Sequence, residues 1–355
     1  MSNFLFPYNW NLSNGYPSAN IQKNNYNVFG TFVCGGGSTM GYKLAGFNHL
    51  GGVEIDPPIA DVYKTNHNPL YLYNQDIRDF NNRNDLPKEL FCLDILDGSP
   101  PCSTFSLAGS REKAWGKEKV FREGQVKQSL DDLVFVYCDT IIKLQPKVFL
   151  LENVKGIIQG NAKVYSKNIV KKMTDAGYNV QVFCLNAALM GVPQKRERVF
   201  FIGHKKEYNL PKLKLEFSEV AIPFGDVFEN VNYNDLTKNQ QYLWDNRIYG
   251  NLDFGVINLR LGNKPNSFTT KLLYKDKVCN TVIGMDNNVL FDIPRKTTKK
   301  EVCQIGTYPL DYNFKTIKPK YLIGMSVPPV MTAQIANQIK IQWLDNINTE
   351  ITPYE

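Results

Sequence analysis

The stretch NVFGTFVCGGGSTMGYKLAGF, residues 27–47, decides the fold. Its first seven residues, Asn27–Val33, are mostly apolar, β-branched or aromatic, which predicts a buried strand. Three glycines follow at Gly35–Gly37, and Met40–Phe47 suits a helix. A strand that turns through glycines into a helix is typical of a ligand-binding edge in an open α/β sheet.

Strands and helices continue to alternate outward from this unit as far as His204. The further strands are expected at Leu50–Ile55, Leu93–Leu96, Val148–Leu151, Val180–Leu185 and Val199–Ile202. The further helices are expected at Pro58–Thr65, Gln128–Leu144 and Lys163–Ala176. We therefore expect an α/β fold with a doubly wound, mostly parallel sheet that helices cover on both faces.

The pattern changes after His204. Residues 205–292 hold short aromatic and polar runs, and helical periodicity returns at Val330–Leu344. This indicates a larger domain of residues 1–204 and 318–355, and a smaller domain of residues 205–317.

Composition limits the class of protein. Of 355 residues, 43% are hydrophobic and 21% charged, which is typical of a globular chain. Neither a transmembrane run nor a secretory signal is predicted. Seven cysteines without a C-x-x-C spacing indicate a reducing compartment, and three histidines make a metal site unexpected. The net charge of +7 is compatible with a polyanionic partner.

Acidic Glu54 ends the second predicted strand, where a carboxylate can accept hydrogen bonds from ribose hydroxyls. The spacing Gly35-x-Gly37-x-x-x-Gly41 is neither the dinucleotide fingerprint nor a P-loop. Nucleotide binding and a plain tight turn with a surface glutamate both remain open from these residues alone.

Cys102 ends the sequence Asp97-Gly98-Ser99-Pro100-Pro101-Cys102, just past another predicted strand. The two prolines stiffen the loop, so the thiol is either a positioned nucleophile or a structural cysteine. Glu152 follows the strand at Val148–Leu151 and is expected at the same sheet edge. Arg196 and Arg198 precede the last strand, where they could hold a phosphate, position Glu152 or simply be solvated.

In combination, these motifs closely resemble those of the DNA (cytosine-5) methyltransferases of prokaryotic or phage type. The shared order is the glycine turn, the acidic strand end, Pro101-Cys102, Glu152-Asn153-Val154 and Gln194-x-Arg196-x-Arg198. The similarity covers roughly residues 27–204 and 293–345, and Arg295–Pro309 matches a framework motif of the family. The resemblance implies the S-adenosylmethionine-dependent methyltransferase fold, with residues 205–317 as the target-recognition domain.

The resemblance also implies S-adenosyl-L-methionine as cofactor, with Glu54 on its ribose and Asp76-Ile77 near its adenine. The residues that match its binding site are Phe32, Cys34, Gly35, Gly37, Glu54, Ile55, Asp76, Ile77, Ser99, Pro101, Ser326 and Val327. Two departures would weaken these contacts: Thr31-Phe32-Val33 replaces the usual Asp-Leu-Phe, and Met325 stands where asparagine is usual.

The residues that match the family's catalytic set are Cys102, Glu152, Arg196 and Arg198. Those assigned to DNA are Ser103, Ser106, Arg111 and Gln194, and no metal is implied. Cys102 would add to cytosine C6, while Glu152 would protonate N3. The basic segment Thr104–Gln128 is expected to close over a flipped-out base, and lysines of the variable region are candidates for phosphate contacts: Lys205, Lys206, Lys212, Lys214, Lys264, Lys271, Lys275 and Lys277.

Four alternatives compete with this interpretation. An NAD-dependent dehydrogenase would explain the glycine turn and Glu54 but not Cys102, Glu152 and the arginines. An adenine amino-methyltransferase would need an aromatic residue where Cys102 stands. A tRNA cytosine-5 methyltransferase shares every motif, and a catalytically weak DNA-binding relative conflicts with the presence of Cys102.

The resemblance further implies duplex DNA as partner, a monomeric enzyme in the bacterial or phage-infected cytoplasm, no membrane, and a cognate restriction endonuclease as a partner to look for.

Overall fold

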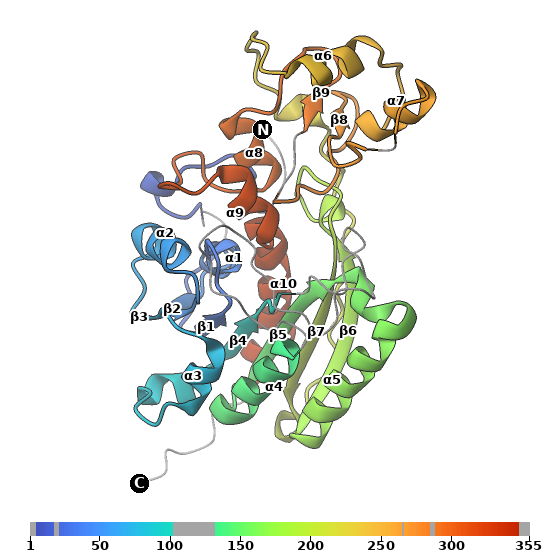
Figure 1. Ribbon diagram of the computed structural model, residues 1–355. Coiled ribbons are helices and arrows are strands. Elements are labelled where there is room, and N and C mark those ends of the chain that lie inside the picture. The colour runs from blue at the N-terminus through green and yellow to red at the C-terminus, as the bar shows by residue number, and fades with distance from the viewer. Residues whose placement is uncertain (1–4, 18–20, 102–131, 265, 285–287, 348–355) are drawn as a thin grey trace. The chain divides into compact units, whose positions relative to one another are not determined.

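The computed structural model describes residues 5–17, 21–101, 132–264, 266–284 and 288–347 (Figure 1). The chain forms two compact units. The sheet unit comprises Ser18–Asn186, Glu197–Glu216 and Thr332–Glu355, and the second unit comprises Met1–Pro17, Ala187–Arg196 and Phe217–Met331. The chain thus passes between the units several times, and the functional division at residues 205–317 stays a prediction.

The sheet unit is built on a seven-stranded sheet with the order β3-β2-β1-β4-β5-β7-β6. Its strands are β1 (Asn27–Thr31), β2 (Asn48–Val53), β3 (Tyr71–Tyr73), β4 (Ile95–Gly98), β5 (Val148–Val154), β6 (Tyr178–Asn186) and β7 (Glu197–Lys205). The pairs from β3 through β5 are parallel, whereas β7 is antiparallel to both β5 and β6. The mostly parallel, doubly wound sheet predicted from the sequence is confirmed.

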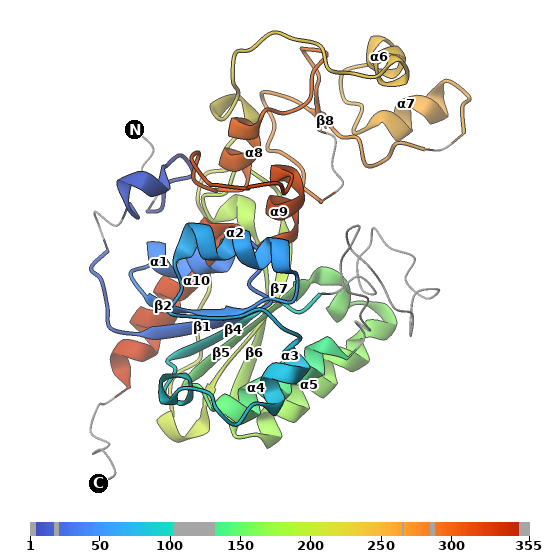
Figure 2. The same ribbon diagram turned by 60° about the vertical axis from the view of Figure 1, so that its left-hand side comes forward.

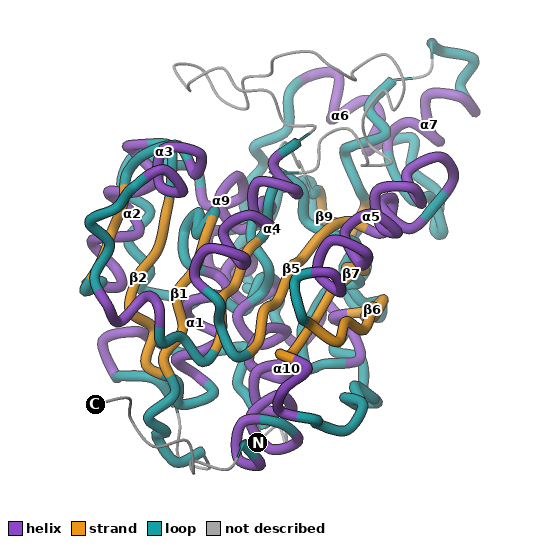
Figure 3. Tube along the Cα trace, turned by 90° about the horizontal axis from the view of Figure 1, so that it is seen from below, coloured by secondary structure: helices purple, strands orange, loops and turns teal. Residues whose placement is uncertain are grey.

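Helices cover both faces of this sheet, as Figures 2 and 3 show from two directions. In Figure 2, α1 and α2 lie on one face, while α3, α4 and α5 lie on the other. The helices are α1 (Gly37–Leu44), α2 (Pro57–His67), α3 (Ile77–Asn82), α4 (Leu133–Leu144), α5 (Lys163–Asp175) and α10 (Pro329–Gln342), whose larger part belongs to this unit. Strands buried on both sides explain the continuous apolar runs of the sequence: β5 is buried from Val148 to Asn153.

Element boundaries follow local sequence signals. Helix α2 begins with Pro57 at its first turn, and α5 ends just before Gly177, which has a φ of 93°. The helix predicted from Gln128 is described only from Leu133, since residues 102–131 lie outside the described part. Strand β6 is longer than its apolar core because pairing with β7 extends it to Tyr178 and Asn186.

The second unit has short elements, in keeping with the change of pattern after His204. They are α6 (Lys238–Asp245), α7 (Phe254–Arg260), β8 (Leu272–Leu273), β9 (Val289–Leu290), α8 (Lys299–Ile305) and α9 (Pro319–Met325). Two small apolar clusters fill it, one around Phe224 and Ile305 and the other around Phe254 and Tyr274. Among the described residues of both units, no helix is long and apolar enough to span a membrane.

A buried ion pair joins the short elements of this unit. Both side chains of Arg295 and Glu301 are 0% exposed, and their closest N–O distance is 2.8 Å. The Arg295 guanidinium also donates to the carbonyl oxygens of Glu229 and Val231, at 2.6 and 3.1 Å. Glu301 caps α8 by accepting from Thr298 N at 2.8 Å. A residue of the predicted framework motif thus holds three segments together.

Glu301→Gln is expected to lower the free energy of unfolding by about 3–5 kcal/mol, because it leaves the Arg295 charge buried beside a neutral amide. Lys340→Gln, which removes the more exposed ion pair with Asp345, should cost about 1 kcal/mol or less. Denaturant unfolding of both variants and the parent protein measures this; equal losses would contradict the framework role of the buried pair.

Candidate active site

The glycine turn after β1 has an unusual backbone. Phe32 and Cys34 have positive φ angles of 55° and 49°, which are costly for residues other than glycine. Gly36, with φ 76°, is the N-cap of α1. Hydrogen bonds hold the turn: Gly36 N donates to Val33 O at 2.8 Å, and Cys34 N donates to Glu54 Oε2 at 2.9 Å. Strain of this kind typically persists at ligand-binding sites, where the surrounding structure enforces it.

Glu54 lies directly after β2 and is 8% exposed. Its second oxygen, Oε1, accepts from Asp56 N at 2.9 Å. Burial raises the pKa of Glu54 to about 7, although the hydrogen bonds from Asp56 and Cys34 favour the ionised form. Each carboxylate oxygen has more than one acceptor site, so this carboxyl can still accept from ligand hydroxyls.

An apolar contact lies beside this turn. Phe32 packs against Ile77 and Leu133, which are both nearly fully buried. Asp76 caps α3 by accepting from Arg78 N at 2.8 Å, and its carboxylate also pairs with the Arg78 guanidinium at 3.2 Å. The structure therefore brings together Phe32 and Ile77, which the family resemblance assigns to one cofactor. Ile55 directly follows Glu54 on the chain.

Three charged residues follow one another across the ends of β4, β5 and β7. Asp97 pairs with Leu150 and Arg198 pairs with Val154, so both side chains lie on the same face of the sheet as Glu152. Arg198 Nε lies 2.9 Å from Glu152 Oε1, and both side chains are largely buried, at 14% and 11% exposure. The structure thus joins two predicted catalytic residues, and Arg198 fixes the orientation of the Glu152 carboxyl.

Asp97 connects this row to the glycine turn. Its Oδ1 accepts from Tyr42 Oη of α1 at 3.3 Å, and its carbonyl oxygen accepts from Thr31 Oγ1 at 3.2 Å. Burial, together with the smaller effect of the nearby Glu152 charge, raises the pKa of Asp97 to about 7, although hydrogen bonds from Tyr42 and Ser38 oppose the rise. Tyr42 and Ser38 were not predicted as site residues, because their distance to Asp97 in the sequence gives no signal of the contact.

Some of the other predicted site residues of the sheet unit are described by the structure, and the rest lie outside the described residues. Gly35 and Gly37 belong to the turn and the first position of α1, and Ser99 and Pro101 lie just beyond β4. Four predicted residues and a predicted loop lie outside the described residues: Cys102, Ser103, Ser106, Arg111 and the segment Thr104–Gln128.

Arg196 and Gln194 are buried within the second unit, at 2% and 1% exposure. The Arg196 guanidinium donates to the carbonyl oxygens of Val282, Gly324 and Ser326, at 3.0, 3.1 and 2.8 Å. Gln194 Nε2 donates to Ile305 O at 3.0 Å, while its Oε1 accepts from Val282 N at 3.0 Å. These contacts make both residues framework residues of this unit; the assignments of Arg196 to catalysis and Gln194 to DNA stay predictions.

Ser326 and Val327 follow α9 in the same unit, and both are 5% exposed. Ser326 Oγ donates to Leu322 O at 2.9 Å and accepts from Tyr308 Oη at 2.7 Å. Because its one hydroxyl hydrogen is committed to Leu322, Ser326 can only accept a further hydrogen bond here. The neighbouring Met325 is 43% exposed.

Residues 26–341 match the family described as C-5 cytosine-specific DNA methylase. The chain belongs to this family. It is therefore a DNA (cytosine-5) methyltransferase with an α/β fold, as the sequence motifs predicted.

Bacterial type II methyltransferases are among the similar proteins. M.FnuDI of Fusobacterium nucleatum is 27% identical over 87% of this chain and 92% of its own length. M1.HphI of Haemophilus parahaemolyticus is 28% identical over 87% of this chain and 85% of its own length. In fold, the methyltransferase resembles Spodoptera frugiperda DNMT2, with a TM-score of 0.63, 17% identity and coverage of 89% of this chain and 99% of the other.

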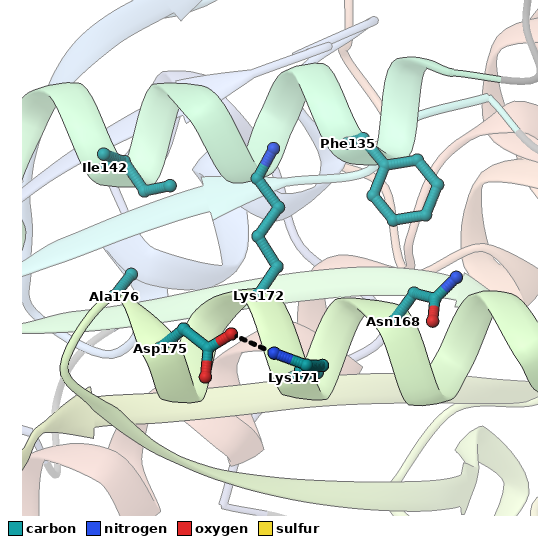
Figure 4. A pocket seen from close by; sticks show the side chains of 7 residues that line it. All are labelled: Phe135, Ile142, Asn168, Lys171, Lys172, Asp175 and Ala176. Atoms are coloured by element: carbon teal, nitrogen blue, oxygen red, sulfur yellow. Dashed lines mark hydrogen bonds and ion pairs between the residues drawn. The ribbon is translucent and has the colours of Figure 1, made fainter.

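A hollow between α4 and α5 lies apart from the site of this methyltransferase (Figure 4). It is lined by Phe135, Ile142, Asn168, Lys171, Lys172, Asp175 and Ala176. Lys171 pairs with Asp175, and Lys172 lies 2.6 Å from Asp139. Since none of the predicted site residues lines the hollow, it has no part in the arrangement described above.

The methyltransferase should lose stability as the pH rises toward 7, because native Asp97 keeps a proton that unfolded aspartate releases near pH 3.8. One such proton contributes a slope of at most about 1.4 kcal/mol per pH unit. Asp97→Asn has no proton to lose, so its unfolding free energy relative to the parent should rise between pH 5 and 7.5. Denaturant unfolding at both pH values measures this. The pH-dependent contribution of Glu54 to the unfolding free energy cancels in the comparison, because both proteins contain Glu54. A difference that does not change with pH would contradict the buried, proton-holding state of Asp97.

Proposed function

We propose that this methyltransferase transfers the methyl group of S-adenosylmethionine to C5 of a cytosine within a short, specific duplex DNA sequence. The observation that carries the proposal is the buried Glu152–Arg198 pair, with an N–O distance of 2.9 Å, at the end of β5. The pair lies on the same sheet face as Asp97. Asp97 belongs to β4, and the chain leads from β4 through Pro101 to Cys102. A carboxyl group held at this edge suits proton transfer to a cytosine ring.

The residues around the glycine turn fit the proposed cofactor. Glu54 offers acceptors for ribose hydroxyls, and the apolar contact of Phe32 with Ile77 suits one edge of an adenine ring. The first turn of α1 adds backbone N–H groups beside the strained Cys34 and Gly36. When bound, S-adenosylmethionine would supply an electrophilic methyl group on its sulfonium centre.

In the proposed reaction, the Cys102 thiolate forms a bond to C6 of the cytosine, and Glu152 gives a proton to N3. Electron density then gathers at C5, which would take the methyl group, and S-adenosylhomocysteine would be the leaving group. Loss of the C5 proton to a base, return of the N3 proton to Glu152 and departure of the Cys102 thiolate from C6 restore the aromatic ring. Arg198 keeps the Glu152 carboxyl oriented toward the ring throughout.

The target base would have to leave the duplex for this chemistry, since stacking on the neighbouring bases covers both faces of the cytosine ring. We propose that residues 205–317 select the target sequence. Support comes from an aromatic surface in the second unit, where Lys277 Nζ lies 4.6 Å from the ring centre of the exposed Tyr249. Cations and aromatic rings of this kind suit phosphate and base contacts.

We further propose that the enzyme acts as a monomer in the cytoplasm of a bacterial or phage-infected cell. The names of its relatives as type II methyltransferases support a search for a cognate restriction endonuclease.

Methyl transfer from labelled S-adenosylmethionine tests the reaction. The parent protein should place label in 5-methyldeoxycytidine of duplex DNA. Cys102→Ser should abolish turnover because the serine hydroxyl is a far weaker nucleophile than a thiolate. Binding of S-adenosylhomocysteine should stay within about twofold in this variant. Label in tRNA alone would move the substrate to the tRNA alternative, and turnover retained by Cys102→Ser would refute the nucleophile.

Replacing residues 205–317 with the corresponding segment of a relative that has a different target should change the methylated sequence. The readout is sequencing of 5-methylcytosine in a plasmid that carries both targets. Methylation that stays at the original target in an active chimera would refute the recognition role of this segment.

A further inference from the structure

We propose that His67 is a positioning residue for the cofactor, because its imidazole donates a hydrogen bond to the Gly35 carbonyl and so fixes the peptide plane of the glycine turn. The inference rests on the proposed use of S-adenosylmethionine at this turn. Neither the sequence motifs nor the family likeness points to this histidine.

His67 is the last residue of α2, and it is 5% exposed. Its Nε2 lies 3.1 Å from Gly35 O. The ring lies so close to the turn that a Cβ atom on Gly36 would be 2.1 Å from the same nitrogen. Only glycine therefore fits between the imidazole and the turn, for reasons of space as well as of its φ of +76°.

The orientation of the peptide between Gly35 and Gly36 is fixed at both ends. Its carbonyl oxygen accepts from His67, and its N–H donates to Val33 O at 2.8 Å. The preceding turn residue, Cys34, is fixed by its bond to Glu54 at 2.9 Å. His67 and Glu54 thus each hold one residue of the same turn. Glu54 is also the proposed ribose acceptor, so the turn is part of the proposed cofactor site. Without the imidazole donor, the Gly35 carbonyl would be left buried without this partner and the plane would be free to tilt.

The imidazole is itself held in place. The ring packs against Tyr63 with the ring centres 4.7 Å apart. The backbone carbonyl oxygen of His67 accepts from Lys43 Nζ of α1 at 3.0 Å. Burial and the charge of Lys43 lower the pKa of His67 to about 3, so the ring is neutral at physiological pH. A neutral ring has a single N–H, which must be on Nε2 because a carbonyl oxygen can only accept.

The experiment compares two replacements of His67. His67→Leu fills similar space but has no donor, whereas His67→Gln keeps an N–H at similar reach. We expect His67→Leu to weaken S-adenosylhomocysteine binding about tenfold by calorimetry, which is about 1.4 kcal/mol, and His67→Gln to stay within about threefold. The KM for S-adenosylmethionine should follow the same order, while kcat at saturating cofactor should change less than twofold in both variants.

A matched control is His204→Leu. His204 is also buried, but its ring packs against Trp343 in another part of the sheet unit, so this variant should bind S-adenosylhomocysteine like the parent. Thermal unfolding without ligand identifies variants that fail to fold, and the more flexible His67→Met replaces His67→Leu in that case.

Three outcomes would overturn the inference. Parent-like binding by folded His67→Leu would make His67 an ordinary core residue. Equal losses in His67→Leu and His67→Gln would assign the effect to ring shape rather than to the N–H donor. A folded parent protein that binds no S-adenosylhomocysteine would refute the proposed function itself, and this inference with it; that result differs from the other two because it appears before any substitution is made.

Discussion

Parallel strands bring their carboxyl ends to one edge of a sheet, and the candidate active site depends on this constraint. Thr31, Val53, Gly98 and Val154 end β1, β2, β4 and β5, and the residues that follow or close these strands form the site. Glu54, Asp97 and Glu152 are far apart in the sequence, but the constraint places them on three strands of one sheet edge. Antiparallel β7 enters the same edge from the opposite direction, so its first residues supply Arg198.

Polar groups compensate each of the three buried carboxyl groups at this edge. Each carboxyl is compensated in a different way: Glu54 by two backbone N–H groups, Asp97 by Tyr42 and Ser38, and Glu152 by Arg198. The pKa values of Glu54 and Asp97 rise to about 7 because hydrogen bonds from neutral donors offset burial only in part. The site therefore contains groups that change charge near neutral pH, which is typical of functional sites.

The second unit shows that a family motif can have a structural role. Arg196 and Gln194 fall within a motif that the family resemblance assigns to catalysis and DNA, but their side chains bond to backbone atoms of four other residues. Together with the Arg295–Glu301 pair, they hold short segments that have little apolar surface of their own. Buried, hydrogen-bonded polar groups can define such segments where a small core does not.

The sequence by itself determined the alternation of strands and helices in the sheet unit, the family and the residues of its main motifs. These follow from local periodicity, glycine and proline positions and motif spacing, which are all properties of neighbouring residues. Only the tertiary structure decided the contact of His67 with Gly35, of Tyr42 with Asp97 and of Arg196 with Gly324, because these partners are 32, 55 and 128 residues apart. Which buried donor meets which acceptor depends on strand order and helix packing, and no local pattern in the chain encodes that meeting.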